Sequence, residues 1–332
     1  MAEYKDVMIY CEVAEGKLAT IATELLGCGR KLADDLGQKL GAALVGSEVS
    51  GLAQEAITFG ADKVYIVDDP LLKDYQTDSY VLAMEKLIKQ VMPQILILGQ
   101  TSIGRDLAPR LAFKLDTVAS MDCVELAIDP DSKQLLQTKP VFGGNALAIF
   151  TSESYPQIAT VRAKAMSPLE PDASKQGEII TVDAGIEPSA IRTKVLEKVP
   201  EEVEGIKLED AKIVVGGGRG IGSAEGFKQL EELAKILKGA VGATRPPCDN
   251  GWVVPGLQIG LTGKIITPDL YIAVAISGAS QHMTGSSGAK AIIAINKDAE
   301  ANIFREARFG IVGDWKKVLP AFTDKVKELL AE

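Results

Sequence analysis

The sequence predicts an α/β protein with two domains, and three observations lead to that fold class. The chain has 332 residues, which corresponds to about two domains at roughly 150 residues each. Short apolar runs rich in β-branched residues alternate with longer segments whose apolar residues recur at helical spacing. Glycine-rich polar loops follow several of these runs. Strands that alternate with helices in this way form parallel sheets covered by helices on both faces.

The N-terminal part shows the alternation most regularly. Strands are expected at 7–10, 42–45, 63–67 and 94–98. Helices are expected at 18–36, 52–59, 79–91 and 104–114. After Asp116 the rhythm changes, and three strand-like segments follow without a helix between them: 118–128, 134–150 and 156–166. We therefore expect an antiparallel strand extension at one edge of the first sheet.

A boundary is expected in the stretch VPEEVEGIKLEDA (199–211), which is polar, charged and without strong periodicity. It separates an N-terminal domain, 1–206, from a C-terminal domain, 207–332. In the second domain, strands are expected at 212–215, 270–276 and 291–295, and a last helix at 315–330. Ser223 can cap another helix, in which Glu225 favours the positive end of the dipole. Both domains are thus expected to be Rossmann-like.

Composition excludes several classes of protein. The chain has 45 acidic and 36 basic residues, a net charge of −9, and a nucleic-acid scaffold would instead need a basic face. The N-terminus lacks the features of a signal or transit peptide, and no apolar run has the length of a membrane span. We expect a cytoplasmic, prokaryotic protein with no membrane span and no nucleic-acid partner.

The small numbers of cysteine and histidine residues exclude further kinds of site. Four scattered cysteines without a C-x-x-C pair argue against a zinc site, an iron–sulfur cluster or a disulfide framework. The single histidine, His282, is the one position for histidine-based chemistry. No G-x-S-x-G motif accompanies it, which disfavours a nucleophilic triad. A hydrogen bond to an anionic cofactor and a purely structural role both remain open.

Polar loops follow the three expected strands of the second domain and the stretch of small residues at 239–243. The loop GGGRGIG (216–222) matches neither the strict dinucleotide fingerprint nor a P-loop. It is either a tight turn that needs positive φ or an anion site, and Arg219 favours the anion. Other strand ends lead into 244–247, 277–282 and 296–298. Since ligands bind beyond the carboxyl ends of parallel strands, these loops predict a nucleotide-sized crevice.

Five segments carry a resemblance to a known family: GGGRGIGS (216–223), GATRPPCDNGW (242–252), LQIGLTGKIITPDLYIAVAISGASQHMTG (257–285), IIAINKDAEANIF (292–304) and FGIVGDW (309–315). Through them the C-terminal domain closely resembles the alpha subunit of electron-transfer flavoprotein. The N-terminal domain agrees more loosely, through VYIVDDP and LGQTSIGRDLAPRLA. The resemblance implies one FAD in the C-terminal domain and an N-terminal domain that packs on a beta subunit.

The resemblance also implies roles for individual residues. Arg219 and Thr244 would contact the cofactor and Arg245 would lie against the isoalloxazine. The Thr262 hydroxyl would lie near flavin N5, and the His282 imidazole would donate on the O2 side. Asn296, Asp314 and Trp315 would contact the adenosine half. The full implied set is Arg219, Thr244, Arg245, Gln258, Ile259, Gly260, Leu261, Thr262, Gly263, Ser277, Gly278, Ala279, Ser280, Gln281, His282, Asn296, Asp314 and Trp315.

Two positions depart from the family pattern. Members often carry a polar residue where this chain has Leu261, so its backbone N–H, rather than its side chain, is available to the flavin. The ending Gly313-Asp314-Trp315 replaces the commoner Ala-Asp-Leu. Trp315 either packs on the adenine or ribose or simply begins the last helix.

The function implied is that of an electron carrier rather than a stand-alone enzyme. It would take electrons from acyl-CoA dehydrogenases or similar flavoenzymes and pass them to another redox partner. An alternative is a flavin-based electron-bifurcating complex that oxidises NADH and reduces ferredoxin or flavodoxin together with an enoyl-CoA. The beta subunit would hold AMP in the first case and a second FAD in the alternative. A non-redox nucleotide-binding module is the third hypothesis.

Overall fold

The computed structural model describes residues 4–144, 146–198 and 206–331. The chain divides into two compact units, an N-terminal unit (Met1–Lys198) and a C-terminal unit (Val199–Glu332). Residues 199–205 of the predicted boundary stretch lie outside the described residues. In the described part of the chain, no helix is both long and apolar enough to cross a membrane.

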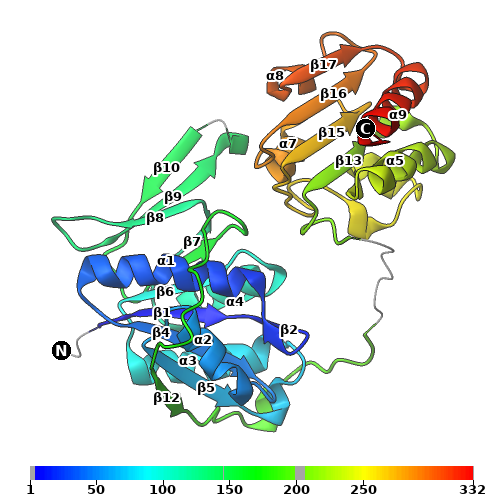
Figure 1. Cartoon of the computed structure of the whole chain (residues 1–332). Helices are drawn as coiled ribbons and strands as arrows, with labels where there is room; N and C mark the ends of the chain where they lie inside the picture. Colours follow the sequence, from blue (N-terminus) through cyan, green and yellow to red (C-terminus); the bar gives the residue numbers. More distant parts are fainter. Residues whose placement is uncertain (1–3, 145, 199–205, 332) are drawn as a thin grey trace. The chain divides into compact units, whose positions relative to one another are not determined.

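The N-terminal unit is built on a seven-stranded sheet in the order β12-β5-β4-β1-β6-β11-β7, with every neighbouring pair parallel (Figure 1). Its strands are β1 (Val7–Cys11), β4 (Leu40–Gly46), β5 (Lys63–Asp68), β6 (Ile95–Gly99), β7 (Ala119–Cys123), β11 (Gln157–Val161) and β12 (Glu178–Thr181). Its helices are α1 (Thr20–Leu36), α2 (Ala53–Thr58), α3 (Thr77–Val91) and α4 (Ser102–Lys114). The short strands β2 (Val13–Ala14) and β3 (Lys17–Leu18) form a hairpin after β1.

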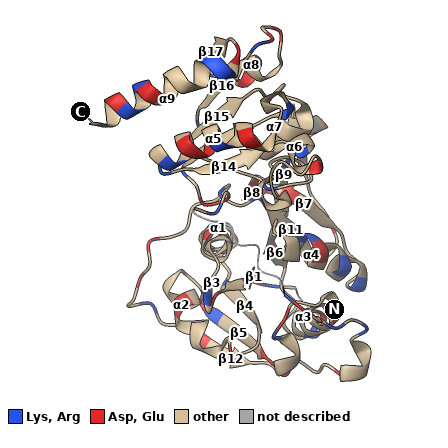
Figure 2. Ribbon diagram, turned by 90° about the vertical axis from the view of Figure 1, so that its right-hand side faces the viewer, with Lys and Arg blue, Asp and Glu red and all other residues tan. Residues whose placement is uncertain are grey.

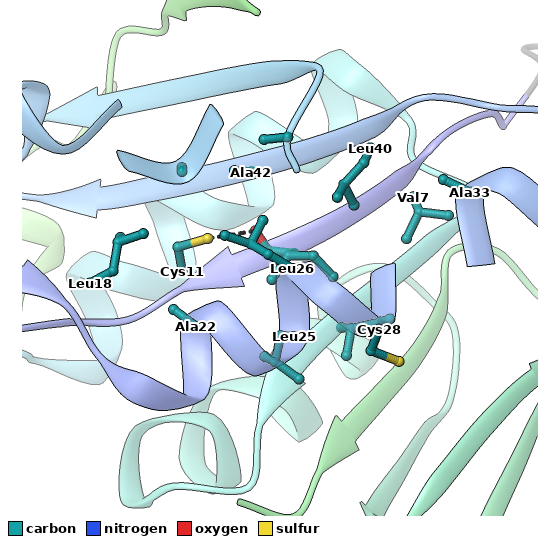
Figure 3. Packing of buried hydrophobic residues seen from close by; sticks show 14 of the residues in the cluster. Val7, Cys11, Leu18, Ala22, Leu25, Leu26, Cys28, Ala33, Leu40 and Ala42 are labelled. Carbon is teal, nitrogen blue, oxygen red and sulfur yellow. Dashed lines mark hydrogen bonds between the residues drawn. The ribbon is translucent and has the colours of Figure 1, made fainter. Parts of the chain in front are cut away.

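Alternate residues of β1 are buried on opposite faces of this sheet. Val7, Ile9 and Cys11 pack with α1 and α2, whereas Met8 and Tyr10 pack with α3 and α4. Figure 3 shows the first of these clusters, in which leucines of α1 lie against β1 and β4. A strand buried on both faces has no polar alternation, so the continuous apolar runs in the sequence predicted the parallel sheet correctly.

The antiparallel part is a separate sheet rather than an edge of the first one. It has three strands in the order β10-β9-β8, namely β8 (Glu125–Ile128), β9 (Leu135–Val141) and β10 (Ala146–Phe150). The expectation was wrong for 156–166 and for the first part of 118–128, because β11 and β7 join the main sheet in parallel, whereas β8 pairs antiparallel with β9. Every residue of β11 is buried, as suits a strand inside a parallel sheet. Strand β12 was missed because its mostly exposed residues show no apolar run.

The C-terminal unit has a five-stranded parallel sheet in the order β14-β13-β15-β16-β17. Its strands are β13 (Ile213–Gly217), β14 (Ala240–Ala243), β15 (Leu270–Val274), β16 (Ile292–Asn296) and β17 (Phe309–Val312). Its helices are α5 (Ala224–Ile236), α6 (Arg245–Asp249), α7 (Ser280–Ser286), α8 (Ile303–Glu306) and α9 (Trp315–Ala331). The predicted fold class of two parallel-sheet, Rossmann-like units is confirmed.

Helix α5 begins as predicted. The Ser223 hydroxyl accepts a hydrogen bond from the Gly226 N–H at 3.3 Å, and Glu225 lies in the first turn. Helices α5 and α9 contain charged residues of both signs (Figure 2). Among the described residues, two ion pairs involve α5: Lys228 with Glu225 at 2.8 Å, and Lys327 with Glu232 at 2.7 Å. The exposed charged residues between 228 and 235 therefore form a solvated helix face.

Candidate functional site

The C-terminal unit contains a cavity of about 740 Å³ beyond the carboxyl ends of its strands. Its walls come from the residues that follow β13, β14, β15 and β16. The strand order reverses between β13 and β15, and a crevice at such a reversal is where parallel sheets bind ligands. The volume falls in the range of roughly 300–1,000 Å³ usual for small-molecule and cofactor sites.

Most of the predicted residues line this cavity. They are Arg219, Thr244, Arg245, Gln258, Ile259, Gly260, Leu261, Thr262, Ser277, Ala279, Gln281, His282 and Asn296. Lining residues that the sequence analysis did not name as site residues are Gly218, Gly220, Pro246, Ala275, Ile276, Asp298, Glu300, Ala301 and Asn302. Gly218, Gly220, Pro246 and Asp298 already lie in the predicted strand-end loops, and the others lie within a few residues of those loops.

Five predicted residues do not line the main cavity: Gly263, Gly278, Ser280, Asp314 and Trp315. Gly263 and Gly278 instead allow close packing of loops. A Cβ on Gly278, where φ is +78°, would lie 2.3 Å from the Ile303 N. A Cβ on Gly263 would lie 2.4 Å from the Gln258 carbonyl oxygen. These two glycines shape the site without forming its wall.

Asp314 and Trp315 line a second cavity of about 220 Å³. It shares Gly220, Ala275 and Asn296 with the main one, so the two cavities adjoin. Trp315 begins α9, and its indole is buried with its Nε1–H donating to the Gly220 carbonyl at 3.0 Å. The indole thus ties the glycine-rich loop to the core. Trp315 both begins the last helix and lines the small cavity, so a contact with the adenosine half stays a prediction.

The first three glycines of the loop 216–222 are required by packing rather than by backbone conformation. A Cβ on Gly217 would lie 2.6 Å from the Phe227 ring, and one on Gly218 would lie 2.1 Å from the Ala275 carbonyl oxygen. Only Gly222 in this loop has a positive φ, of +91°. The expectation of a turn that needs positive φ therefore applies to one glycine of the loop.

Arg219 is the group that this loop offers to an anion. The Gly218 N–H donates to the Val274 carbonyl at 3.0 Å, and the Gly226 N–H in the first turn of α5 is capped by Ser223. The Arg219 side chain, in contrast, is exposed at the cavity and has no ion-pair partner among the described residues. A guanidinium in this setting can form charge-assisted hydrogen bonds to phosphate.

Arg245, the first residue of α6, supplies a second guanidinium to the cavity wall. Its Nε donates to Asp249 at 3.2 Å within the same helix, and two thirds of its side chain is exposed. Exposed pairs of this kind contribute little energy, so the arginine can turn to another anion at small cost.

The turn from Gln258 to Lys264 presents one hydroxyl. The Thr262 Oγ1 accepts a hydrogen bond from Gln258 Nε2 at 2.9 Å, which leaves the hydroxyl proton of Thr262 free to donate. The Leu261 N–H, which was expected to be available to the flavin, donates to the Gln281 carbonyl at 2.7 Å. The side chain of Leu261 is exposed at the cavity, so this residue offers an apolar surface instead of a donor.

His282 lies in the first turn of α7 and not in the loop where it was expected. Its side chain is buried, and both ring nitrogens have protein partners: Tyr271 Oη at 2.8 Å from Nε2 and the Ile259 carbonyl oxygen at 3.1 Å from Nδ1. Burial lowers the pKa of His282 to about 4, and the ring is therefore neutral at pH 7. The imidazole has no unpaired N–H to donate, in contrast to the expected donor role.

Asn296 fastens two strand ends at the junction of the cavities. Its Nδ2 donates to the Ile276 carbonyl at 2.9 Å, and its Oδ1 accepts from the Asp298 N–H at 3.0 Å. Both halves of the amide are thus occupied by the protein. Asn296 therefore positions the cavity walls. Its second Nδ2–H and the second lone pair of Oδ1 remain available to a ligand.

Comparison with known families agrees with this geometry. Residues 7–187 match the family described as "Electron transfer flavoprotein domain", and residues 207–287 match "Electron transfer flavoprotein FAD-binding domain". The second match covers much of the cavity wall, including Arg219, Arg245, Thr262 and His282.

Similar proteins span the whole chain. It is 47% identical over 330 residues to "Electron transfer flavoprotein subunit alpha" of Thermoanaerobacterium thermosaccharolyticum, covering 99% of this chain and 100% of the relative. It is 44% identical to the protein of the same description from Megasphaera elsdenii, covering 99% and 98%. It is 42% identical to "Protein FixB" of Clostridium saccharobutylicum, covering 100% and 99%. The chain belongs to the electron transfer flavoprotein family, as an alpha subunit.

Proposed function

We propose that the C-terminal unit binds one FAD in the main cavity and the small cavity beside it. The observation that carries this proposal is the pair of adjoining cavities beyond the carboxyl ends of β13 to β16, with two exposed guanidinium groups in the wall. An extended dinucleotide has two anionic phosphates between two ring systems. Two adjoining cavities whose walls hold two guanidinium groups and apolar surface such as Leu261 fit such a molecule in volume and charge.

The residues present suit different parts of the cofactor. Asp314, Trp315 and Asn296 would hold the adenosine half at the small cavity, and Arg219 would hold a phosphate. Arg245, Thr262 and the buried His282 would surround the isoalloxazine. When bound, FAD supplies the capacity to accept and release electrons.

The charged and polar groups of the chain would then set how readily the flavin accepts electrons. The Arg245 guanidinium favours negative charge in the cavity, and the Thr262 hydroxyl can donate a hydrogen bond to a ring nitrogen. Hydrogen bonds to charged groups contribute roughly 1.5–3 kcal/mol each, enough to change a reduction potential measurably. The apolar Leu261 restricts water at the same wall.

The test is the cofactor content of the chain purified with its beta subunit. We expect a visible absorption spectrum typical of a flavin and one FAD per alpha chain after denaturation. A complex that carries no flavin, and takes up none when FAD is added back, would contradict the proposal. A colourless complex that still binds another nucleotide would instead support a non-redox nucleotide-binding module.

We infer that the chain acts as one half of a heterodimer and that electrons reach it from acyl-CoA dehydrogenases or similar flavoenzymes. The family membership supports both inferences. One FAD and one AMP per heterodimer, with no reduction by NADH, would indicate a simple carrier. Two FAD per heterodimer and direct reduction by NADH would indicate the bifurcating alternative, which passes electrons to ferredoxin or flavodoxin as well.

Strand β10 is where we propose that the beta subunit docks. It is an edge strand, since β9 is its only neighbour in the sheet, and its residues are apolar but mostly exposed. Leu147 and Ile149 are 64% and 65% exposed. An exposed apolar edge strand promotes uncontrolled association unless another chain covers it.

Ile149→Glu tests this docking surface in the co-expressed pair. We expect the two subunits to separate during size-exclusion chromatography, because the carboxylate would be buried in the interface. Leu196→Glu is the matched control, since Leu196 is 89% exposed but lies outside the sheet. A heterodimer that survives Ile149→Glu would show that the partner binds elsewhere.

A further inference from the structure

Tyr271 is a fully buried residue of β15 that does not line the cavity, yet it contacts a residue that does. Its Oη lies 2.8 Å from His282 Nε2, and the two ring centroids are 5.9 Å apart. Within the described residues, His282 is the one hydrogen-bond partner of this hydroxyl. The Tyr271 hydroxyl therefore forms its hydrogen bond with the His282 imidazole.

The other ring nitrogen determines the direction of that hydrogen bond. His282 Nδ1 lies 3.1 Å from the Ile259 carbonyl oxygen, which can only accept. The proton of the neutral imidazole must then be on Nδ1, and Nε2 has only a lone pair. Tyr271 is left as the donor to Nε2, so the two partners together select one tautomer and fix the ring plane.

The neighbouring strand leaves space for the phenol. A Cβ on Gly216 of β13 would lie 2.2 Å from Tyr271 Oη, so a side chain at this position would displace the hydroxyl from the imidazole. Gly216 pairs with Ala273, two residues along β15 from Tyr271. The first glycine of the loop thus serves the tyrosine and not a phosphate.

We propose that Tyr271 is a positioning residue that holds His282 in the neutral Nδ1–H form with both nitrogens paired. This rests on the proposed function, in which the His282 ring forms part of the flavin site. The ring then meets the cofactor as a fixed neutral surface. Without the phenol, Nε2 would be unpaired and could take a proton from solvent when negative charge is added to the flavin.

The single histidine makes a direct test possible. The alpha chain is labelled with ¹⁵N-histidine, combined with unlabelled beta subunit, and its ring nitrogens are recorded by NMR with and without FAD. Every ring signal then comes from His282. We expect one protonated nitrogen, Nδ1, and one hydrogen-bonded acceptor, Nε2. In Tyr271→Phe we expect the Nε2 resonance to shift and the flavin midpoint potential to become more positive.

Controls separate this role from a purely structural one. Tyr80→Phe removes another buried hydroxyl, which donates to the Leu72 carbonyl at 2.9 Å in the N-terminal unit, and should change neither readout. If Tyr271→Phe does not fold, Gly216→Ala displaces the phenol without removing it and should shift the same resonance.

Three results would overturn the proposal: a proton on Nε2 in the wild type, an unmoved Nε2 resonance in the variant, or an unchanged potential. The tautomer can be measured in flavin-free protein. A failure of the FAD proposal would appear separately, as the absence of flavin absorbance in samples whose tautomer is as proposed.

Discussion

Both units are built on a parallel sheet whose strand order reverses beside the first strand, but they differ at the point where that reversal can form a site. In each sheet the strand order reverses beside the first strand, between β1 and β6 in one unit and between β13 and β15 in the other. The C-terminal unit has a cavity of about 740 Å³ there. In the N-terminal unit the buried carboxyl group of Glu12 follows β1, and it accepts a hydrogen bond from Thr101 Oγ1 at 2.6 Å.

The difference lies in the segments that follow the strands. Strand β6 ends at Gly99 and α4 begins at Ser102, so the helix packs directly on the strand end. Strand β15 ends at Val274 and α7 begins only at Ser280, which leaves a loop to form a wall. A reversal of strand order is therefore a position where a ligand site can form. The length and the residues of the segments that follow the strands decide whether a cavity is present there.

The largest expected effect is that of Gly104→Ala in the closed unit. A Cβ on Gly104 would lie 1.8 Å from the Gly99 carbonyl oxygen, so α4 would have to move off β6. Overpacking costs typically about 1–3 kcal/mol, and a backbone contact this close should cost at least about 3 kcal/mol. Denaturant unfolding measures the loss. Gly51→Ala, which has open space around it, is the control. Equal stability of both variants would show that this strand end is not tightly packed.

The pH dependence of stability should have opposite signs in the two units. Burial raises the pKa of Glu12 to about 7, so the folded protein keeps a proton that the unfolded chain loses between about pH 4.5 and 7. Stability of the N-terminal unit should fall as pH rises through that window. For His282, with a pKa lowered to about 4, the unfolded chain binds the extra proton between about pH 4 and 6.5. Stability of the C-terminal unit should fall as pH decreases.

Hydrogen exchange on peptides from each unit can follow the two trends separately. Each shift corresponds to an effect of about 3 kcal/mol across its window. Glu12→Gln should flatten the first trend and leave the second, and His282→Gln should do the reverse. If both units respond to pH with the same sign, the contrast between a buried protonated carboxyl and a buried neutral imidazole is wrong.

Arg245→Ala tests the open unit. Losing a charge-assisted hydrogen bond of roughly 1.5–3 kcal/mol should raise the Kd for FAD about 10- to 100-fold, measured by titration of the flavin-free protein. Arg110→Ala is matched to it, because Arg110 also forms an exposed pair, with Asp106, four residues away in its helix. Equal losses in both variants would mean that the effect is general and not a property of the cavity.

The smallest effects concern the N-terminal caps of α5, which follows β13, and of α4, which follows β6. Ser223→Ala removes the cap of α5 and should cost about 1 kcal/mol. Thr101→Ala removes the cap of α4, where Thr101 Oγ1 accepts from the Gly104 N–H at 3.0 Å, and also leaves Glu12 without its donor. We expect the larger loss for Thr101→Ala. A larger loss for Ser223→Ala would contradict the tighter closure of the N-terminal unit.

Much of the fold could be predicted because its signals are local. Apolar runs marked the buried parallel strands, and Ser223 followed by Glu225 marked the start of a helix. The loops 216–222, 244–247, 277–282 and 296–298 were placed at strand ends by pattern alone. The individual site residues within them came from resemblance to a family, because no spacing in one sequence distinguishes a wall residue such as Thr262 from a packing residue such as Gly263.

The sequence by itself thus determined two parallel-sheet units, their strand ends and the family to which they belong, since periodicity, caps and motifs are properties of neighbouring residues. Tertiary structure alone decided that β11 returns to the parallel sheet and that one reversal is closed while the other is open. It also decided that the Leu261 backbone N–H and the His282 ring N–H donate to carbonyl groups of the protein. Hydrogen-bond partners and steric neighbours such as Tyr271 and Gly216 are far apart along the chain, and only folding brings them together.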